Sequence, residues 1–227
     1  MGRGESGAGD AAFLERRLRM VEDQLVARDV RDPRLLQAFR ELPRDRFVPP
    51  ELASLAHEDR ALPIAAGQTI SQPYVVALMI EAVTLGGRDR LLEVGTGSGY
   101  AAALCARLCA EVYTVERNAD LADEASARLA ALGLANVHVR IGDGSLGWPD
   151  AAPFDAILVA AAGPRVPEAL SAQLAVGGRL VMPVGARGIQ QLVRVTRAGE
   201  TRFEREPLGE VAFVPLIGDQ GWHDEPR

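Results

Sequence analysis

The sequence predicts an α/β fold built on a mostly parallel sheet with helices on both faces. Two features of the chain after residue 89 support this prediction. Short apolar stretches typical of strands alternate with helical stretches, which is the order expected when parallel strands are joined by crossover helices. The run Ala156–Val159 is continuously apolar instead of alternating, as a strand buried on both faces requires.

The composition fits one globular domain and excludes several other classes. The chain has 227 residues, 48% of them hydrophobic and 25% charged. Its formal charge of −6 argues against a nucleic-acid partner, and no apolar run approaches the ~20 residues of a membrane span. No signal-peptide pattern opens the chain, so a cytoplasmic protein is expected. We also expect the protein to be a monomer. Cys105 and Cys109 lie four residues apart in a helical stretch, which indicates reduced, buried side chains and no metal site.

The sequence pattern of the first third of the chain predicts a mostly helical segment. An amphipathic pattern from Phe13 to Val30 predicts one helix. A second helix is expected to begin at Asp32-Pro33, with Asp as the cap and Pro in the first turn, and to end near Leu42. An irregular stretch punctuated by prolines follows, and then a third helix that ends near Leu85.

The elements of the predicted sheet follow in order. Strands are expected over residues 91–94, 112–115, 137–141, 154–160 and 179–184, with helices over residues 100–110, 118–132 and 166–174. The stretches 191–197 and 211–216 also have strand character. No helix separates these last two, so we expect them to pair antiparallel, and Pro215 limits the second to an edge or a strand end.

These elements give a simple domain division. Residues 1–12 are rich in glycine and are expected to form a disordered N-terminal tail. Residues 13–227 form a single domain. Within it, residues 13–88 are a cap that carries the active-site segment, residues 89–217 form a cofactor-binding sheet, and residues 218–227 are a polar C-terminal tail.

A glycine loop joins the first strand of the sheet to its helix. Gly95, Gly97 and Gly99 allow a tight turn and let a ligand approach the backbone closely. Glu116 stands just past the second strand, where a carboxylate can accept hydrogen bonds from both ribose hydroxyls of an adenosine cofactor. A tight turn and a solvated acidic residue at a strand end are the simpler alternatives.

The spacing of the loop indicates which cofactor binds. A nicotinamide site favours G-x-G-x-x-G, whose third glycine would fall at Tyr100, whereas this loop reads G-x-G-x-G. Asp143, between two glycines after the third strand, can reach an adenine amino group, although Asp-Gly also favours a plain turn. With the reversed final strands, these features favour S-adenosylmethionine in a Rossmann-like class I methyltransferase fold of seven strands. A nicotinamide oxidoreductase and a non-catalytic adenosine-binding module are the alternatives.

A polar cluster precedes the third helix. Gln68, Thr69 and Ser71 are uncharged and lie between two apolar stretches, with no histidine or charged residue among them. Ser71 can cap the helix that begins at Pro73, or it can donate a hydrogen bond to a bound anion. The spacing leaves both roles open.

Four stretches resemble protein-L-isoaspartate O-methyltransferases, and the likeness covers nearly all of residues 17–217. The Gly67–Pro73 segment is specific to this family, whereas many methyltransferases share the glycine loop. The stretch 211–216 agrees as well. The four stretches lie within residues 62–73, 92–100, 142–155 and 177–185.

The resemblance implies an activity and a set of site residues. The activity is methylation of the free carboxylate of isoaspartyl residues in damaged proteins, which starts repair through a succinimide. S-Adenosylmethionine is the implied donor, S-adenosylhomocysteine the product, and Ser71 the implied catalytic residue. The implied cofactor contacts are Gln68, Thr69, Ile70, Ser71, Glu93, Gly95, Thr96, Gly97, Ser98, Gly99, Glu116, Arg117, Asp143 and Gly144.

This reaction suits a site without histidine. A carboxylate acceptor has a pKa near ~4, so it is ionised at neutral pH and needs no general base. The sulfonium donor loses its positive charge as the methyl group moves, so a dry site helps. Neutral donors can align the carboxylate without neutralising it, and alignment can supply up to ~7–11 kcal/mol. The polar cluster is therefore interpreted as a neutral clamp for an anionic acceptor.

The chain departs from the family pattern at four positions. Ala65 and Ala66 replace a glycine and an aromatic residue or histidine, His57 replaces a frequent tyrosine, and Ala160 replaces a common threonine. The alanine pair leaves open a related methyltransferase that acts on an aspartate of a specific peptide or on a small carboxylic acid. We interpret His57 and His138 as structural or exposed, and His223 as solvent-facing.

Overall fold

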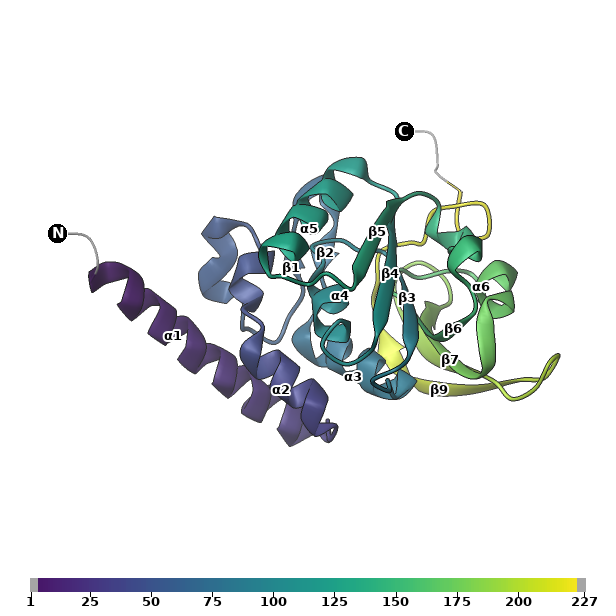
Figure 1. Cartoon of the computed structure of the whole chain (residues 1–227), viewed down its shortest axis with the longest axis horizontal. Helices are drawn as coiled ribbons and strands as arrows, with labels where there is room; N and C mark the ends of the chain where they lie inside the picture. The colour runs from purple at the N-terminus through teal and green to yellow at the C-terminus, as the bar shows by residue number, and fades with distance from the viewer. Residues whose placement is uncertain (1–3, 224–227) are drawn as a thin grey trace.

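The computed structural model describes the backbone of residues 4–223 and the side chains of residues 11–223. A seven-stranded sheet forms its centre, in the order β5-β4-β3-β6-β7-β8-β9 (Figure 1). The strands from β5 to β7 are parallel, while β8 is antiparallel to both of its neighbours. The bounds are Arg90–Val94 for β3, Glu111–Glu116 for β4, Val137–Ile141 for β5, Phe154–Val159 for β6, Leu174–Val184 for β7, Gln190–Arg197 for β8 and Phe203–Val211 for β9.

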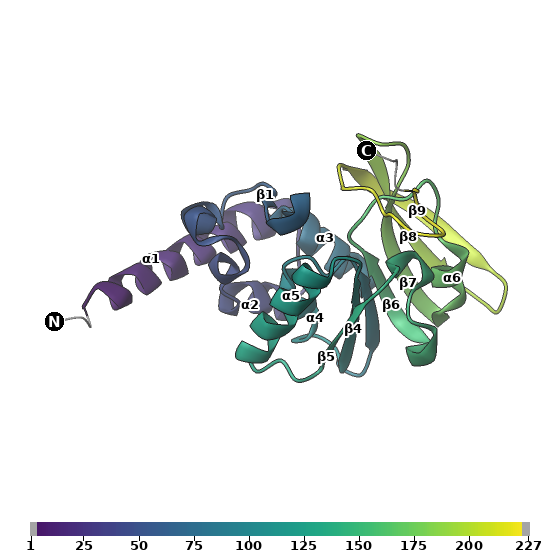
Figure 2. The ribbon, with the colours of Figure 1, turned by 90° about the horizontal axis from the view of Figure 1, so that it is seen from above.

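Helices cover both faces of this sheet, as Figure 2 shows. The cap and helices α3, α4 and α5 pack on one face, whereas α6 and the segments that follow β5 and β9 pack on the other. No helix within residues 4–223 is long and apolar enough to cross a membrane. The helices are α1 Gly4–Met20, α2 Pro33–Glu41, α3 Pro73–Val83, α4 Tyr100–Cys105, α5 Ala119–Ala131 and α6 Glu168–Ala172, with short 3-10 or π turns at Val21–Leu25, Val26–Arg28, Arg44–Phe47, Pro50–Leu55, Ala65–Gly67, Gly144–Leu146 and Pro149–Ala151.

Strand β3 explains why the apolar runs of this chain do not alternate. Successive side chains of a strand point to opposite faces. Leu91 belongs to the core beneath the cap and Leu92 to the core beneath α6, and both are fully buried. A strand with both faces covered needs apolar residues at consecutive positions, so the predicted doubly covered sheet is confirmed.

The first N-terminal helix begins and ends at different residues from those predicted, whereas the second agrees with its prediction. Helix α1 begins at Gly4, so residues 4–12 of the expected disordered tail are helical. Alanines favour a helix and no proline interrupts the segment, which explains the extension. Residues 1–3 lie outside the described residues. Helix α2 begins as predicted, because the Asp32 carboxylate accepts a hydrogen bond from the Arg34 N–H at 2.8 Å and Pro33 occupies the first turn.

The C-terminal part of the sheet corrects one prediction. The expected strand over residues 211–216 is wrong, since the seventh strand is β9, Phe203–Val211. Strand β9 is an edge strand exposed on both faces, so its sequence is rich in charge and lacks the alternation that marks a half-buried strand. The segment after Val211 instead crosses the carboxyl end of the sheet, where Pro215 forms an isolated bridge with Ala162.

Candidate functional site

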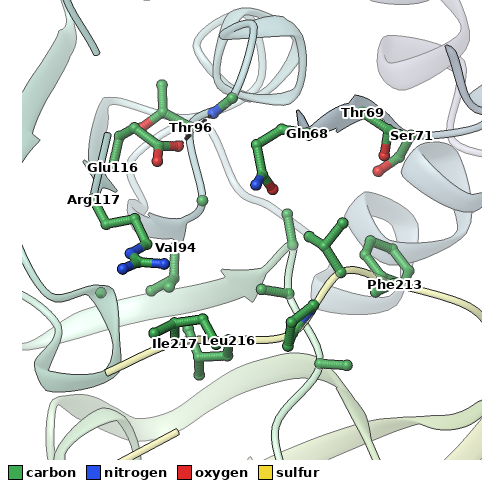
Figure 3. A pocket seen from close by; sticks show the side chains of 18 of the residues that line it. Gln68, Thr69, Ser71, Val94, Thr96, Glu116, Arg117, Phe213, Leu216 and Ile217 are labelled. Carbon is green, nitrogen blue, oxygen red and sulfur yellow. Dashed lines mark hydrogen bonds between the residues drawn. The ribbon is translucent and has the colours of Figure 1, made fainter. Parts of the chain in front are cut away.

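A cavity of about 740 Å³ opens at the carboxyl ends of β3, β4 and β6. This size lies within the ~300–1,000 Å³ typical of small-molecule sites. Strand β3 pairs with β4 on one side and β6 on the other, so the cavity sits where the order of the strands reverses, the usual ligand position in such sheets. Figure 3 shows Glu116 and Arg117 at one end of this cavity and Thr69 and Ser71 at the other.

The glycine loop forms one wall of the cavity and is fixed to the neighbouring strand. Gly95, Gly97 and Gly99 have φ values of 93°, 52° and 84°, a backbone region that favours glycine. The Gly97 N–H donates to a Glu116 carboxylate oxygen at 2.9 Å, and the Gly95 N–H donates to the Val115 carbonyl at 2.9 Å. Strand β4 therefore sets the position of the loop.

Glu116 lines the cavity at the end of β4. Its carboxylate is 6% exposed and accepts hydrogen bonds from the N–H groups of Gly97 at 2.9 Å and Asn118 at 3.0 Å, one on each oxygen. An ionised carboxylate offers about four lone-pair sites, so acceptor capacity is left for two hydroxyl groups. The predicted position for binding a ribose is therefore open to the cavity.

Glu93 adds a second buried carboxyl group to the same wall. It is 2% exposed and accepts a hydrogen bond from the Thr114 hydroxyl at 2.5 Å, and Thr114 in turn contacts the Thr96 hydroxyl at 2.6 Å. Burial raises the pKa of Glu93 to about 8, with the nearby Glu116 charge adding to the effect and the Thr114 hydrogen bond opposing it. Burial therefore favours the neutral form of Glu93.

The polar cluster lies on a small hairpin. Strands β1, Leu62–Pro63, and β2, Thr69–Ile70, pair antiparallel, and the Ile64 N–H donates to the Gln68 carbonyl at 2.9 Å. This hairpin places Gln68, Thr69, Ile70 and Ser71 on the cavity wall. Immediately after it, the Gln72 amide donates to an Asp59 carboxylate oxygen at 2.8 Å, which anchors the segment to the cap.

Ser71 is not the cap of the following helix. The N-cap position of α3 is Gln72, and within residues 4–223 the Ser71 hydroxyl has no hydrogen-bond partner. The capping interpretation is therefore excluded. The hydroxyl of a half-buried serine is left available to a molecule that enters the cavity.

A second, smaller cavity of about 370 Å³ adjoins the first. Thr69, Ser71 and Phe213 are among the residues that line both. Among the described residues that line the smaller cavity, Glu210 alone is charged. Ser71 thus stands where a large cavity meets a mostly uncharged groove.

The structure brings most of the predicted site residues together. Gly99 and Asp143 are the exceptions, since neither lines the cavity. A Cβ added at Gly99 would lie 3.3 Å from the Ala125 Cβ, so this glycine permits close packing of α4 and α5. The predicted residues that line the cavity are Gln68, Thr69, Ile70, Ser71, Glu93, Gly95, Thr96, Gly97, Ser98, Glu116, Arg117 and Gly144.

The Asp143 carboxylate is used within the protein. It accepts hydrogen bonds from the Ser145 N–H at 2.8 Å, the Ser145 hydroxyl at 2.7 Å and the Asp219 N–H at 2.7 Å. It therefore ties the C-terminal segment to the turn after β5. The sequence could not show this contact, because Asp219 is far from Asp143 along the chain.

The C-terminal segment supplies a wall that the motif analysis did not assign to the site. Its backbone is fixed by Gln190, whose side-chain oxygen accepts from the Phe213 N–H at 2.9 Å. In the sequence, the likeness of residues 211–216 to the family was the one feature that could have pointed to this wall of the cavity. The additional lining residues from this part of the chain are Arg187, Gly188, Gln190, Phe213, Val214, Pro215, Leu216, Ile217 and Trp222.

The three histidines lie outside the cavity, as predicted. His57 is buried in the cap, and burial lowers its pKa to about 4, while Asp45 opposes the shift. His138 is exposed and contacts a Glu111 carboxylate oxygen at 2.6 Å. His223 is exposed.

The arrangement of this site agrees with the similarity of the chain to known proteins. The model of the family described as protein-L-isoaspartate(D-aspartate) O-methyltransferase matches residues 15–221. A protein-L-isoaspartate O-methyltransferase of Methylorubrum extorquens is 60% identical over 210 residues, which are 92% of this chain and 92% of that protein. One from Rhodopseudomonas palustris is 59% identical over 204 residues, 89% of this chain and 94% of that protein.

Solved structures support the same assignment. A structure named protein-L-isoaspartate O-methyltransferase has a TM-score of 0.79 and 28% identity, and the match covers 92% of this chain and 67% of that one. A protein of Plasmodium falciparum described by the same activity, solved with S-adenosyl-L-homocysteine, has the same fold, with a TM-score of 0.77, 23% identity and coverage of 88% and 98%. The chain belongs to the protein-L-isoaspartate(D-aspartate) O-methyltransferase family and is a methyltransferase dependent on S-adenosylmethionine.

Proposed function

We propose that the large cavity binds S-adenosylmethionine, that the adjoining groove binds the isoaspartyl segment of a damaged protein, and that Ser71 aligns the two. The observation that carries this proposal is the position of Ser71 in the walls of both cavities. A methyl donor and its acceptor must meet at one point, and the junction of the two cavities provides it.

The residues of the large cavity fit this cofactor. Its volume suits an adenosine with an amino-acid side arm, and the glycine loop lets such a ligand approach the backbone. Glu116 holds acceptor capacity for ribose hydroxyls at one end, while Thr69 and Ser71 lie at the other end, where they also line the groove. Asp143 and Gly99 do not line the cavity but hold its surroundings in place: Asp143 anchors the C-terminal segment, and Gly99 allows α4 and α5 to pack closely.

When bound, S-adenosylmethionine supplies an electrophilic methyl group. The protein has to hold the acceptor carboxylate in line with it, because the carboxylate is already a nucleophile at neutral pH. The free Ser71 hydroxyl and nearby backbone N–H groups act as neutral donors for this purpose. Phe213 and Val214, which line both cavities, exclude water from the junction.

The acceptor is tested with two synthetic peptides that differ only in whether one residue is isoaspartate or aspartate. The two carboxylates sit differently on the backbone, so a site that aligns one misplaces the other. We expect rapid release of labelled methanol from the isoaspartyl peptide and little from its twin. Equal rates, or turnover of small carboxylic acids alone, would favour the related methyltransferases with other acceptors.

We further infer that the protein acts as a cytoplasmic monomer without nucleic-acid or membrane partners. The negative net charge supports the absence of a nucleic-acid partner. Light scattering with the full chain tests the monomer directly, and a dimer mass would overturn that part of the proposal.

A further inference from the structure

Two carboxyl groups, Glu93 and Glu116, share the wall of the cofactor cavity but differ in their hydrogen bonds. Both are more than nine-tenths buried. Glu116 accepts hydrogen bonds from two backbone N–H groups. Glu93 instead belongs to a chain of side chains with the hydroxyls of Thr114 and Thr96. Hydroxyl groups can turn, so this chain suits either a protonated or an ionised carboxyl.

Among the side chains of residues 11–223, no cationic group contributes to the pKa shift of Glu93. Glu116 lies on the neighbouring strand β4, and Cys105 lies on α4 above it. The main-chain N–H of Ala102 also favours the ionised form of Glu93, while burial opposes it more strongly. Arg117 and Arg187 line the same cavity. Burial, and to a lesser degree the neighbouring Glu116 charge, favour the neutral form of Glu93.

The cofactor brings a further positive charge into this cavity. S-Adenosylmethionine carries a sulfonium cation, and its demethylated product does not. A cation that enters a buried site favours the ionised form of a nearby carboxyl, and the interaction is stronger there than in water.

We propose that Glu93 holds a proton in the empty cavity and releases it to solvent when S-adenosylmethionine binds, so that this residue makes the site discriminate the cationic donor from the neutral product. The raised pKa of Glu93 agrees with a carboxyl that is neutral before binding. The proposal rests on the cofactor assignment made above. It gives product release a physical cause, because the charge that stabilises ionised Glu93 disappears as the methyl group leaves.

The test counts protons by calorimetry of the full chain in buffers with different ionisation enthalpies at pH 7. If ionisation on binding is near complete, S-adenosylmethionine should release about 0.9 proton from Glu93, and the product should release fewer. The α-amino group of the ligand also titrates near this pH. Glu93→Gln is therefore the matched control, since it keeps the shape and the acceptor for Thr114 while removing only the titrating group.

A second measurement compares affinities from pH 6 to pH 9. The ratio of S-adenosylmethionine to S-adenosylhomocysteine affinity should fall at least threefold, roughly, toward pH 6 in the wild type and stay flat in Glu93→Gln. Carbon NMR of the wild-type Glu93 carboxyl, with and without ligand, reports the same ionisation without any variant. It therefore tests the proposal even if Glu93→Gln does not fold.

Three outcomes would overturn the proposal. They are equal proton counts in the wild type and a folded Glu93→Gln, parallel pH profiles for the two ligands, and a Glu93 carboxyl signal that stays ionised in the empty protein. A protein that binds neither ligand would instead refute the cofactor assignment, so the two failures are distinguishable.

Discussion

Replacement of Ser71 by alanine tests the central assignment of this site. The substitution removes one hydroxyl from the junction of the two cavities and nothing else. That hydroxyl has no hydrogen-bond partner within residues 4–223, and the N-cap of α3 is the neighbouring Gln72. Among the residues that the structure describes, no hydrogen bond of the Ser71 side chain is therefore lost in the variant.

The structure allows two magnitudes to be estimated. A partly exposed serine without a hydrogen bond should change the free energy of unfolding by less than ~0.5 kcal/mol when truncated, whereas loss of a helix cap would cost ~0.5–2 kcal/mol. A hydrogen bond to a charged group is worth ~1.5–3 kcal/mol. Because the carboxylate loses charge as it reacts, we expect an effect at or below the lower end of this range, ~1–2 kcal/mol, which is about a 5- to 30-fold loss of rate.

Single-turnover methylation of an isoaspartyl peptide, measured beside thermal melts and cofactor affinity, separates these effects. Ser126→Ala is the matched control, because its hydroxyl contacts only the Ala122 carbonyl, at 2.8 Å, and lies outside both cavities. Ser71→Thr keeps the hydroxyl and adds a methyl group, so it should keep the fold and lose rate through crowding. A fully active Ser71→Ala protein would refute the clamp and leave alignment to backbone N–H groups alone.

Three other predictions follow from buried or strained groups. Glu116→Ala leaves the Gly97 N–H and the ribose hydroxyls without an acceptor, so affinity for S-adenosylmethionine should fall by ~1.5–3 kcal/mol in calorimetry, and unchanged affinity would remove Glu116 from the site. The pKa of His57 is about 4 in the folded state and 6.5 in the unfolded state. Between these two values the unfolded state binds a proton that the folded state does not. The free energy of unfolding should therefore be highest above pH ~6.5 and should decrease as the pH falls toward 4. After allowance for partial solvent screening, the decrease in the free energy of unfolding is ~1–3 kcal/mol. Urea titrations should show this decrease in the wild type but not in His57→Phe. Ala66 has a φ of 55°, a left-handed conformation that costs ~1–2 kcal/mol for alanine, so Ala66→Gly should raise the unfolding free energy, and a lower melting temperature would contradict this reasoning.

The features predicted correctly from the sequence are those encoded by neighbouring residues. The cap at Asp32-Pro33 depends on one turn of chain, and the glycine loop depends on three left-handed positions within five residues. Glu116 was found because strand, helix and strand follow each other at regular spacing, which brings the ends of β3 and β4 to one edge. These signals are local. They determined the fold class and the family, which are confirmed, and the residues of the cofactor site, which stay a prediction.

The missed features depend on contacts between distant residues. The edge strand β9 has no apolar face, so its charged sequence does not predict a strand. The apolar segment that follows it was predicted as the strand instead. That segment instead closes the cavity, where Asp219 reaches the Asp143 carboxylate across the fold. Nothing in the local sequence of Asp143 distinguishes a ligand contact from this internal anchor.

The sequence by itself determined which residues are available for chemistry, because the spacing of glycines, acids and neutral polar groups follows from local backbone geometry. The tertiary structure alone decided how those residues are used. It placed Ser71 at the junction of two cavities, since only packing sets which side chain faces a cavity. It also showed that Gln72, and not Ser71, is the N-cap of α3. It also put Glu93 beside Glu116 in a dry wall, and the protonation of a carboxyl depends on burial and neighbouring charge, which become defined only when the chain is folded.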